Sequence, residues 1–507
     1  MSQRLEALKL RMAELADLRH AATLADWDQQ TQMPRGGGEA RAESMATLER
    51  LAHELFIDDE TGRALDDAAA EIDGSDPDGD DARLVRLIRR QYGKARRVPA
   101  ELAADLARAA SAGQEVWVRA REDADFAAFA PALERNIELA RNYVECHLPC
   151  GEYECAYDVV LDDYEPEMKT STVGTLFAEL TGQLVPMLDR LRNEGTEPDD
   201  TILHVTVPVE RQRELVAQTI ALMGFDRETW RMDDAVHPFA TRIGRGDVRV
   251  TTRWDERYFP AGLYGAMHEV GHGLYEAGIP PRLSRSPLGT TISLGVHESQ
   301  SRLWENMVGR GRAFCTALAP LISQRLGGEL AGLDPDALHR AVNRVTPSLI
   351  RVEADEVTYG LHIALRFELE QRLIDGTLPV RDLPEAWNAR FAELLGIEVP
   401  DDAHGVLQDV HWAGGLIGYF PTYSLGNLIA GQLWAQAHAD IPDLDDRLAA
   451  GELGPLREWL AEHVHRYGAK FTTTELLQRA GGGEMSVAPY ISYLKDKLGR
   501  VYQLDSL

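Results

Sequence analysis

The order of apolar and polar positions along the chain predicts a mainly helical protein. Through most of the sequence, apolar residues recur at intervals of three and four, which is the spacing of a helix that buries one face. Short stretches instead alternate between apolar and polar residues, as half-buried strands do. The predicted helices cover residues 4–24, 40–56, 83–92, 100–146, 170–195, 209–223, 299–325, 336–347, 353–375, 384–395 and 422–438, and the predicted strands cover 201–209 and 247–254.

One further helix is marked clearly between Pro260 and Gly278. A proline is tolerated in the first turn of a helix, because its missing amide hydrogen would have no partner there. Gly278 followed by Pro280 is a typical helix stop. An apolar stripe for the core is formed, at spacings of three and four, by Leu263, Met267, Val270 and Leu274.

Three glycines, Gly265, Gly271 and Gly273, lie inside this helix. A glycine in a helix interior is about 1 kcal/mol less favourable than an alanine. We therefore expect another backbone or a substrate to approach the helix closely at these positions.

The same helix carries the sequence His-Glu-Val-Gly-His at positions 268–272. Histidines four residues apart lie on one face of a helix, so both imidazoles can reach a single metal ion. Glu269 projects from the same turn and can take a proton from a water molecule that the ion activates. The motif therefore predicts metal-assisted hydrolysis, with His268 and His272 as ligands and Glu269 as the general base.

A catalytic zinc ion usually takes three protein ligands, so a third ligand is needed. We predict Glu298, because the stretch after the metal helix has the composition of a loop and allows a second helix to return alongside the first. Glu276 is nearer in sequence but is expected to be a solvated helix residue. His297 is a weaker candidate, and its alternative role is as an outer partner of the ligands or a substrate contact.

Motifs throughout the chain resemble those of the carboxypeptidase Taq family of metallocarboxypeptidases. They accompany the His-Glu-Val-Gly-His helix and the Glu298 segment in a fixed order. The resemblance covers nearly the whole chain and rests on Trp27-Asp28-Gln29, Tyr157-Asp158, 162–166, His237-Pro238-Phe239, 247–251, 350–356, 405–412 and 418–427. It implies a mainly helical fold with a deep central cleft, similar to neurolysin and angiotensin-converting enzyme. It also implies removal of single residues from peptide C-termini, and homodimers.

The resemblance also implies roles for residues outside the metal helix. His411 and Tyr419 are similar to the histidine and tyrosine pair of angiotensin-converting enzyme, so we prefer Tyr419 over Tyr423 as the donor to the developing oxyanion. Arg351, assisted by His411, is the predicted partner of the substrate's terminal carboxylate. Its alternative role is an ion pair with Asp355. The other substrate-contact candidates are Arg249, His237, Gln408, Asp409 and His297.

The predicted strand 247–254 ends just before the metal helix, with Arg249 on its polar side. In related zinc peptidases an edge strand at this place pairs with the substrate backbone. Free N–H and C=O groups of an edge strand are a template for an extended peptide, so an ordinary sheet strand and a substrate-binding strand are compatible readings.

Length alone would suggest about three domains for 507 residues. The candidate residues from His237 to Tyr423 must nevertheless share one cleft, so we predict a single catalytic domain, 1–507, with two lobes. The sequence lacks the run of about 18 apolar residues that a membrane span needs. Its first residues have the pattern of an amphipathic helix rather than of a signal peptide, so a cytoplasmic location is expected.

The net charge of −29 predicts that nucleic acid is repelled rather than bound. A site of two histidines and a glutamate suits one divalent ion per chain, which we expect to be Zn²⁺, and Co²⁺ suits the same ligands.

The sequence therefore predicts a metal-dependent carboxypeptidase of broad specificity that acts on peptides with a free terminal carboxylate. An oligopeptidase or a dipeptidyl carboxypeptidase would use the same metal chemistry. A non-catalytic peptide-binding relative is a further alternative, which the intact His-Glu-Val-Gly-His motif disfavours. An aminopeptidase has the least support, because the sequence has no family-like motif for binding an N-terminal amine.

Overall fold

The computed structural model describes residues 3–507, and the prediction of a mainly helical protein with a small sheet is confirmed. A π-helix, Leu303–Gly309, directly continues α11. The α-helices are α1 (Gln3–Thr31), α2 (Gly38–Ile57), α3 (Asp59–Glu71), α4 (Asp80–Arg97), α5 (Ala100–Glu122), α6 (Phe126–His147), α7 (Ala156–Leu161), α8 (Thr170–Glu194), α9 (Val209–Met223), α10 (Pro260–Gly278), α11 (Leu294–Arg302), α12 (Arg312–Leu326), α13 (Pro335–Ala341), α14 (Thr358–Asp375), α15 (Leu383–Leu395), α16 (Pro421–Asp440), α17 (Leu444–Ala449), α18 (Gly454–His463), α19 (Thr473–Arg479) and α20 (Ala488–Tyr502).

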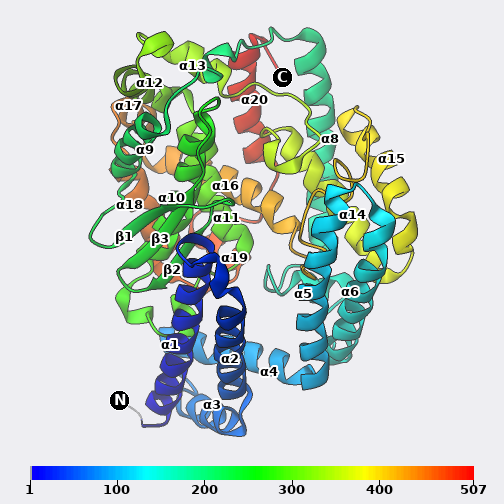
Figure 1. Cartoon of the computed structure of the whole chain (residues 1–507). Coiled ribbons are helices and arrows are strands. Elements are labelled where there is room, and N and C mark those ends of the chain that lie inside the picture. Colours follow the sequence, from blue (N-terminus) through cyan, green and yellow to red (C-terminus); the bar gives the residue numbers. More distant parts are fainter. Residues whose placement is uncertain (1–2) are drawn as a thin grey trace.

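Figure 1 shows α10, α11 and α16 near the middle of the molecule, with the sheet on one side and α5, α6, α14 and α15 on the other. Buried apolar side chains form one continuous cluster that runs from Leu5 in α1 to Tyr502 in α20. Among the helices of residues 3–507, none is both long enough and apolar enough to cross a membrane.

Two predicted helices are interrupted in the structure. The predicted helix 100–146 is divided into α5 and α6, because Ala124 adopts a positive φ of 50°. The side chain of Asp125 then accepts a hydrogen bond from the amide of Ala128 at 3.1 Å and starts α6. The predicted helix 299–325 is divided into the end of α11, the π-helix and α12. Our predictions did not include α3, α7 or the C-terminal helices α17 to α20.

The sheet contains β1 (Trp230–Asp234), β2 (Ala240–Gly244) and β3 (Asp247–Thr252) in the order β1-β3-β2. β1 is parallel to β3, and β2 is antiparallel to it. The prediction of a strand at 247–254 is confirmed, but the idea that it lies at the edge is wrong. Because β3 pairs on both sides, its backbone groups are already used, and β1 and β2 are the edges.

The predicted strand at 201–209 is also wrong. Thr201–Leu203 forms a short 3₁₀ turn, and the chain then continues as an irregular segment up to α9. The amide of Val207 donates to the carbonyl of Glu256 at 2.8 Å, so this segment bonds to a loop rather than to a neighbouring strand. Alternation alone could not distinguish this segment from a strand, since strand pairing needs a partner elsewhere in the chain.

The helix α10 has the predicted bounds, and its predicted apolar stripe is buried. A Cβ atom added to Gly271 would lie 2.8 Å from both the carbonyl oxygen of Gln300 and the Cα of Ser301, which are backbone atoms of α11. A Cβ atom added to Gly273 would meet the side chain of Trp230 on β1. The expectation that another backbone approaches this helix closely is therefore confirmed at Gly271.

Replacing Gly271 with alanine should lower the free energy of unfolding by about 1–3 kcal/mol, the usual cost of overpacking a core. The added methyl group has no room, since its neighbours are backbone atoms of α11. Urea unfolding of the metal-free variant and parent measures the difference.

The matched control is Gly182→Ala in α8, where an added Cβ has nothing within 4 Å. That change should raise the free energy of unfolding by up to about 1 kcal/mol, because alanine is the better helix former. If the Gly271 variant gained stability as the control does, the close packing of α10 on α11 would be contradicted.

Candidate metal centre

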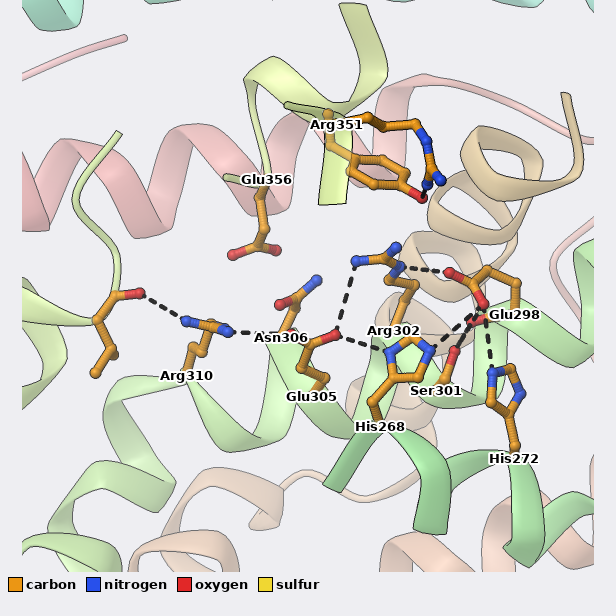
Figure 2. A network of polar contacts seen from close by, with 12 residues as sticks. His268, His272, Glu298, Ser301, Arg302, Glu305, Asn306, Arg310, Arg351 and Glu356 are labelled. Atoms are coloured by element: carbon orange, nitrogen blue, oxygen red, sulfur yellow. Dashed lines mark hydrogen bonds and ion pairs between the residues drawn. The ribbon is translucent and has the colours of Figure 1, made fainter. Parts of the chain in front are cut away.

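The side chains of His268, His272 and Glu298 converge at one point between α10 and α11 (Figure 2). Their ligand atoms all lie within 4.8 Å of one another. Oε2 of Glu298 lies 3.7 Å from Nε2 of His268 and 3.4 Å from Nε2 of His272. Ligands placed about 2.0–2.2 Å from a tetrahedral ion lie roughly 3.3–3.6 Å apart. The three residues therefore fit a small divalent ion.

The outer nitrogen of each histidine is held by a second partner. Nδ1 of His268 lies 2.9 Å from Oε2 of Glu305, and Nδ1 of His272 lies 3.0 Å from the carbonyl oxygen of His297. Both partners are acceptors, so each Nδ1 carries a proton, and Nε2 is the nitrogen that each ring turns toward the ion. This is the arrangement that fixes a metal-binding imidazole in its orientation and tautomer.

Glu298 is held so that a single oxygen faces the histidines. Nε of Arg302 donates to Oε1 of Glu298 at 2.6 Å, and the hydroxyl of Ser301 lies 3.2 Å from Oε2. Burial alone would raise the pKa of Glu298, but the charges of Arg302 and His268 hold it well below its usual range. Glu298 therefore remains a carboxylate, with Oε2 turned toward the histidines.

The electrostatic surroundings favour a cation at this point. Burial alone would lower the pKa of His268, but the carboxylates of Glu298 and Glu305 raise it to about 9. Burial and the neighbouring His297 lower the pKa of His272 to about 3, so His272 is a neutral imidazole. The carboxylates thus attract positive charge, while His272 offers the electron pair that a metal ion requires.

Glu269 lies on the same turn of α10 as His268, and it is buried. Burial raises the pKa of its carboxyl group to about 7, against the opposing charge of His268. A group with a pKa near 7 can both accept and return a proton at neutral pH. Its environment therefore suits the general-base role that the sequence predicted.

The alternative ligands Glu276 and His297 lie outside the cluster. Nε2 of His297 lies 3.3 Å from Oε1 of Glu276, so these two side chains face each other. The ring of His297 stacks on that of His272, with centroids 4.2 Å apart. His297 therefore packs against the ring of His272, and the carboxylate of Glu276 faces His297 and not the metal centre.

His411, Tyr419 and Tyr423 form an aromatic group. Nε2 of His411 lies 3.1 Å from the hydroxyl of Tyr423, and the rings of the two tyrosines are 5.3 Å apart. Burial, reinforced by the charge of Glu298, raises the pKa of Tyr419. Its hydroxyl group therefore stays protonated and can donate a hydrogen bond.

Arg351 is buried and pairs with Asp409 rather than with Asp355. Its Nε and Nη2 lie 3.0 and 2.8 Å from Oδ1 of Asp409, and its Nη1 lies 3.0 Å from the hydroxyl of Tyr359. Asp355 instead accepts hydrogen bonds from the amides of Val357 and Thr358, where α14 begins. The predicted alternative, an ion pair between Arg351 and Asp355, is wrong.

Gln408 and Asp409 hold Arg351 in place. Oε1 of Gln408 accepts from the amide of Arg351 at 2.8 Å. The second oxygen of Asp409 pairs with Arg366, a fully buried residue that our predictions did not include. An arginine between the apolar residues Leu365 and Phe367 of α14 was the available signal. Asp409 thus lies between two guanidinium groups, and both of its oxygens accept hydrogen bonds from protein side chains.

Two predicted substrate contacts are not brought to the metal centre. Arg249 pairs with Asp247 at 2.8 Å and lies over the ring of Trp27 in α1, 4.1 Å from its centroid. Val248 packs against α10, so the alternation of β3 turns Arg249 to the opposite face of the sheet. His237 is exposed in the turn between β1 and β2, and within residues 3–507 it makes no hydrogen bond or ion pair with the metal-centre residues.

A His-Glu-x-x-His helix beside a carboxylate from a second helix is typical of metallopeptidases. The sequence profile described as Carboxypeptidase Taq (M32) metallopeptidase matches residues 7–498. The chain belongs to this family, and it is therefore a metallocarboxypeptidase of the Taq type.

Relatives match the chain over nearly its whole length. Thermostable carboxypeptidase 1 of Thermus thermophilus is 43% identical over 498 residues, which cover 96% of this chain and 97% of the relative. Carboxypeptidase 1 of Bacillus subtilis is 37% identical, and the matched residues cover 96% of this chain and 96% of the relative. The crystal structure of the M32 carboxypeptidase from Deinococcus radiodurans R1 has a TM-score of 0.94 at 38% identity, covering 99% of this chain and 100% of that one.

Replacing His268, His272 or Glu298 with alanine should each abolish stoichiometric metal binding and peptide hydrolysis, because two ligands cannot hold the ion tightly. Elemental analysis of dialysed protein measures the metal content. Glu276→Ala is the control and should keep one ion per chain, since Glu276 faces His297 instead. Full metal occupancy in Glu298→Ala would show that the third ligand is a different residue.

Proposed function

We propose that this protein is a broad-specificity carboxypeptidase that releases single amino acids from the C-terminus of peptides, with residues 1–507 as one catalytic domain. The observation that carries the proposal is the buried guanidinium of Arg351, which contacts link to the metal centre. Arg302 binds Glu298 (Figure 2). The guanidinium of Arg302 also lies over the ring of Tyr359, and the hydroxyl of Tyr359 accepts a hydrogen bond from Arg351. A terminal carboxylate at Arg351 would place only the last residues of a peptide at the metal centre.

His268, His272 and Glu298 are the proposed ligands of one divalent ion, Zn²⁺ or, on the same ligands, Co²⁺. When bound, such an ion polarises the scissile carbonyl and acidifies water. Glu269 takes a proton from the attacking water as its oxygen adds to the carbonyl carbon. Glu269 then passes a proton to the departing amine nitrogen as the C–N bond breaks.

Tyr419 is the proposed hydrogen-bond donor to the oxyanion that develops in this reaction. Tyr423 is the less suitable of the two tyrosines, because its hydroxyl group is engaged with His411. Burial lowers the pKa of His411 to about 4, so His411 is a neutral imidazole, and its Nε2 lies 3.1 Å from the hydroxyl of Tyr423. His411 therefore acts on substrate through the aromatic group that it orders, rather than as a charge.

We also propose a two-lobed shape with a deep central cleft, as in neurolysin and angiotensin-converting enzyme, a homodimeric assembly and a cytoplasmic location. A cleft follows from the chemistry, since the substrate must reach side chains that are mostly buried. The remaining proposals rest on the sequence and not on the structure.

Glu269→Gln should keep one metal ion per chain and lose several orders of magnitude in turnover. The amide has the size of the carboxylate, but it cannot accept the proton. Metal analysis and the steady-state kcat on a blocked dipeptide test this together. A turnover within tenfold of the parent would rule out Glu269 as the general base.

The parent should strongly prefer a peptide with a free C-terminal carboxylate to the same peptide amidated. Loss of one member of a charge-assisted pair in a water-poor site costs about 2–5 kcal/mol, or roughly 30- to 5000-fold in kcat/KM. Arg351→Ala should largely remove this preference, because both changes delete the same interaction. Mass spectrometry of the products gives the rates and the size of the released fragment.

Arg249→Ala is the matched control and should discriminate as the parent does, since Arg249 lies on the far face of the sheet. If the parent cleaved amidated peptides equally well, the oligopeptidase alternative would replace the carboxypeptidase. Release of dipeptides would instead identify a dipeptidyl carboxypeptidase. If Arg351→Ala kept the parent's preference, another cation would be the anchor.

A further inference from the structure

Glu305, the outer partner of His268, belongs to the π-helix that follows α11. The amide of Arg310 donates to the carbonyl of Glu305 at 3.1 Å, which is the i to i−5 bond of this geometry. The guanidinium of Arg310 also holds Oε1 of Glu305 at 3.0 Å (Figure 2). π-Helices are rare, and they often occur at functional sites. The position of the carboxylate that orients His268 therefore depends on how this segment is fixed.

The end of the π-helix leaves a backbone carbonyl without its helical partner. A continued π-helix would direct the amide of Gly311 to the carbonyl of Asn306, but that amide bonds to Val308 at 2.9 Å. An unpaired carbonyl in a buried segment needs another donor. The ammonium group of Lys497 donates to this carbonyl at 3.2 Å.

Lys497 lies on α20, the last helix of the chain, and its side chain is only 5% exposed. Its charge is balanced by Glu356, whose Oε2 lies 2.5 Å from Nζ. The hydroxyl of Tyr493, one turn earlier on α20, lies 3.0 Å from Oε1 of Glu356 and 3.2 Å from the Asn306 carbonyl. Because a phenol has one hydrogen, it can donate to only one of these at a time. Lys497 is therefore the steadier donor to the π-helix.

We propose that Lys497 is a positioning residue for the metal centre: by holding the Asn306 carbonyl, it fixes the π-helix that presents Glu305 to His268. The proposal rests on the proposed metal site. A buried ion pair is weak evidence for stability alone, since apolar residues of the same size often serve as well. Here the pair has a second effect, because its cation bonds to the backbone next to Glu305.

The test is the Kd for Zn²⁺ of the full-length, metal-depleted protein, measured by competition with a chromogenic chelator. The variant is Lys497→Met combined with Glu356→Gln, which leaves no unpaired buried charge. Loss of a direct outer partner of a metal ligand weakens binding about 10- to 100-fold, and Glu305→Gln should do so. Lys497 acts one step further out, so we expect the Kd to rise roughly three- to tenfold.

A double-mutant cycle separates positioning from a general loss of structure. If Lys497 acts through Glu305, the Lys497 and Glu356 changes should alter the Kd less than twofold when Glu305→Gln is already present. Tyr493→Phe offers a milder variant if the first does not fold, and it should weaken Zn²⁺ binding by a smaller factor. Tyr490→Phe is the matched control on the same helix, since its hydroxyl bonds to the carbonyl of Glu356 and not to Asn306. It should leave the Kd unchanged.

An unchanged Kd in the Lys497 variant would overturn the proposal, as would equal effects with and without Glu305. His268→Ala is measured alongside and should abolish tight Zn²⁺ binding. If His268→Ala abolishes tight Zn²⁺ binding and the Lys497 variant binds Zn²⁺ with the Kd of the parent, the metal site is supported and the positioning role is ruled out. If His268→Ala binds Zn²⁺ as the parent does, the metal site and the positioning role fail together.

Discussion

The close contact between α10 and α11 is the constraint on which the metal centre depends. Gly271 lets the backbone of α11 pass where any side chain would collide, and this brings Glu298 up to the two histidines of α10. On its other side α11 meets Gly426 of α16, where an added Cβ would lie 2.8 Å from Cβ of Glu298. Glu298 is thus held between two glycine contacts, and its carboxylate has little freedom to leave the histidines.

Pairing of buried charges determines which carboxylate remains reactive. Glu298 is engaged by Arg302, and Glu305 is engaged by Arg310 and His268. Glu269 has no such guanidinium partner among residues 3–507, and burial raises its pKa to about 7. Paired carboxylates keep their negative charge, while the unpaired one is set to exchange a proton near neutral pH. Charge pairing also matters at Arg351. Asp409 carries one negative charge and is shared by Arg351 and Arg366, so the group of three side chains keeps a net positive charge.

Local pattern was sufficient to predict α10, its apolar stripe and the face that carries both histidines. These depend on the 3.6-residue period and on turn chemistry, which short stretches of sequence encode. The close approach at Gly271 was also predictable, because a glycine that weakens a helix needs a compensating contact. The loop after α10 allowed Glu298 to be proposed as a partner of the histidines, and the structure places it beside them. The regular apolar pattern of α20 was present in the sequence and was missed.

Tertiary structure alone decided which distant groups meet. The alternating pattern of β3 predicted a strand correctly, but it did not predict which strands lie beside it. Strand order depends on contacts with other segments, which periodicity does not describe. For the same reason Arg249 was predicted to face substrate, although it lies over Trp27. Sequence proximity suggested Asp355 as the partner of Arg351, whereas the fold supplies Asp409 from a remote loop. The bond from Lys497 to the π-helix is of this kind too, since a buried ion pair forms only where packing brings its members together.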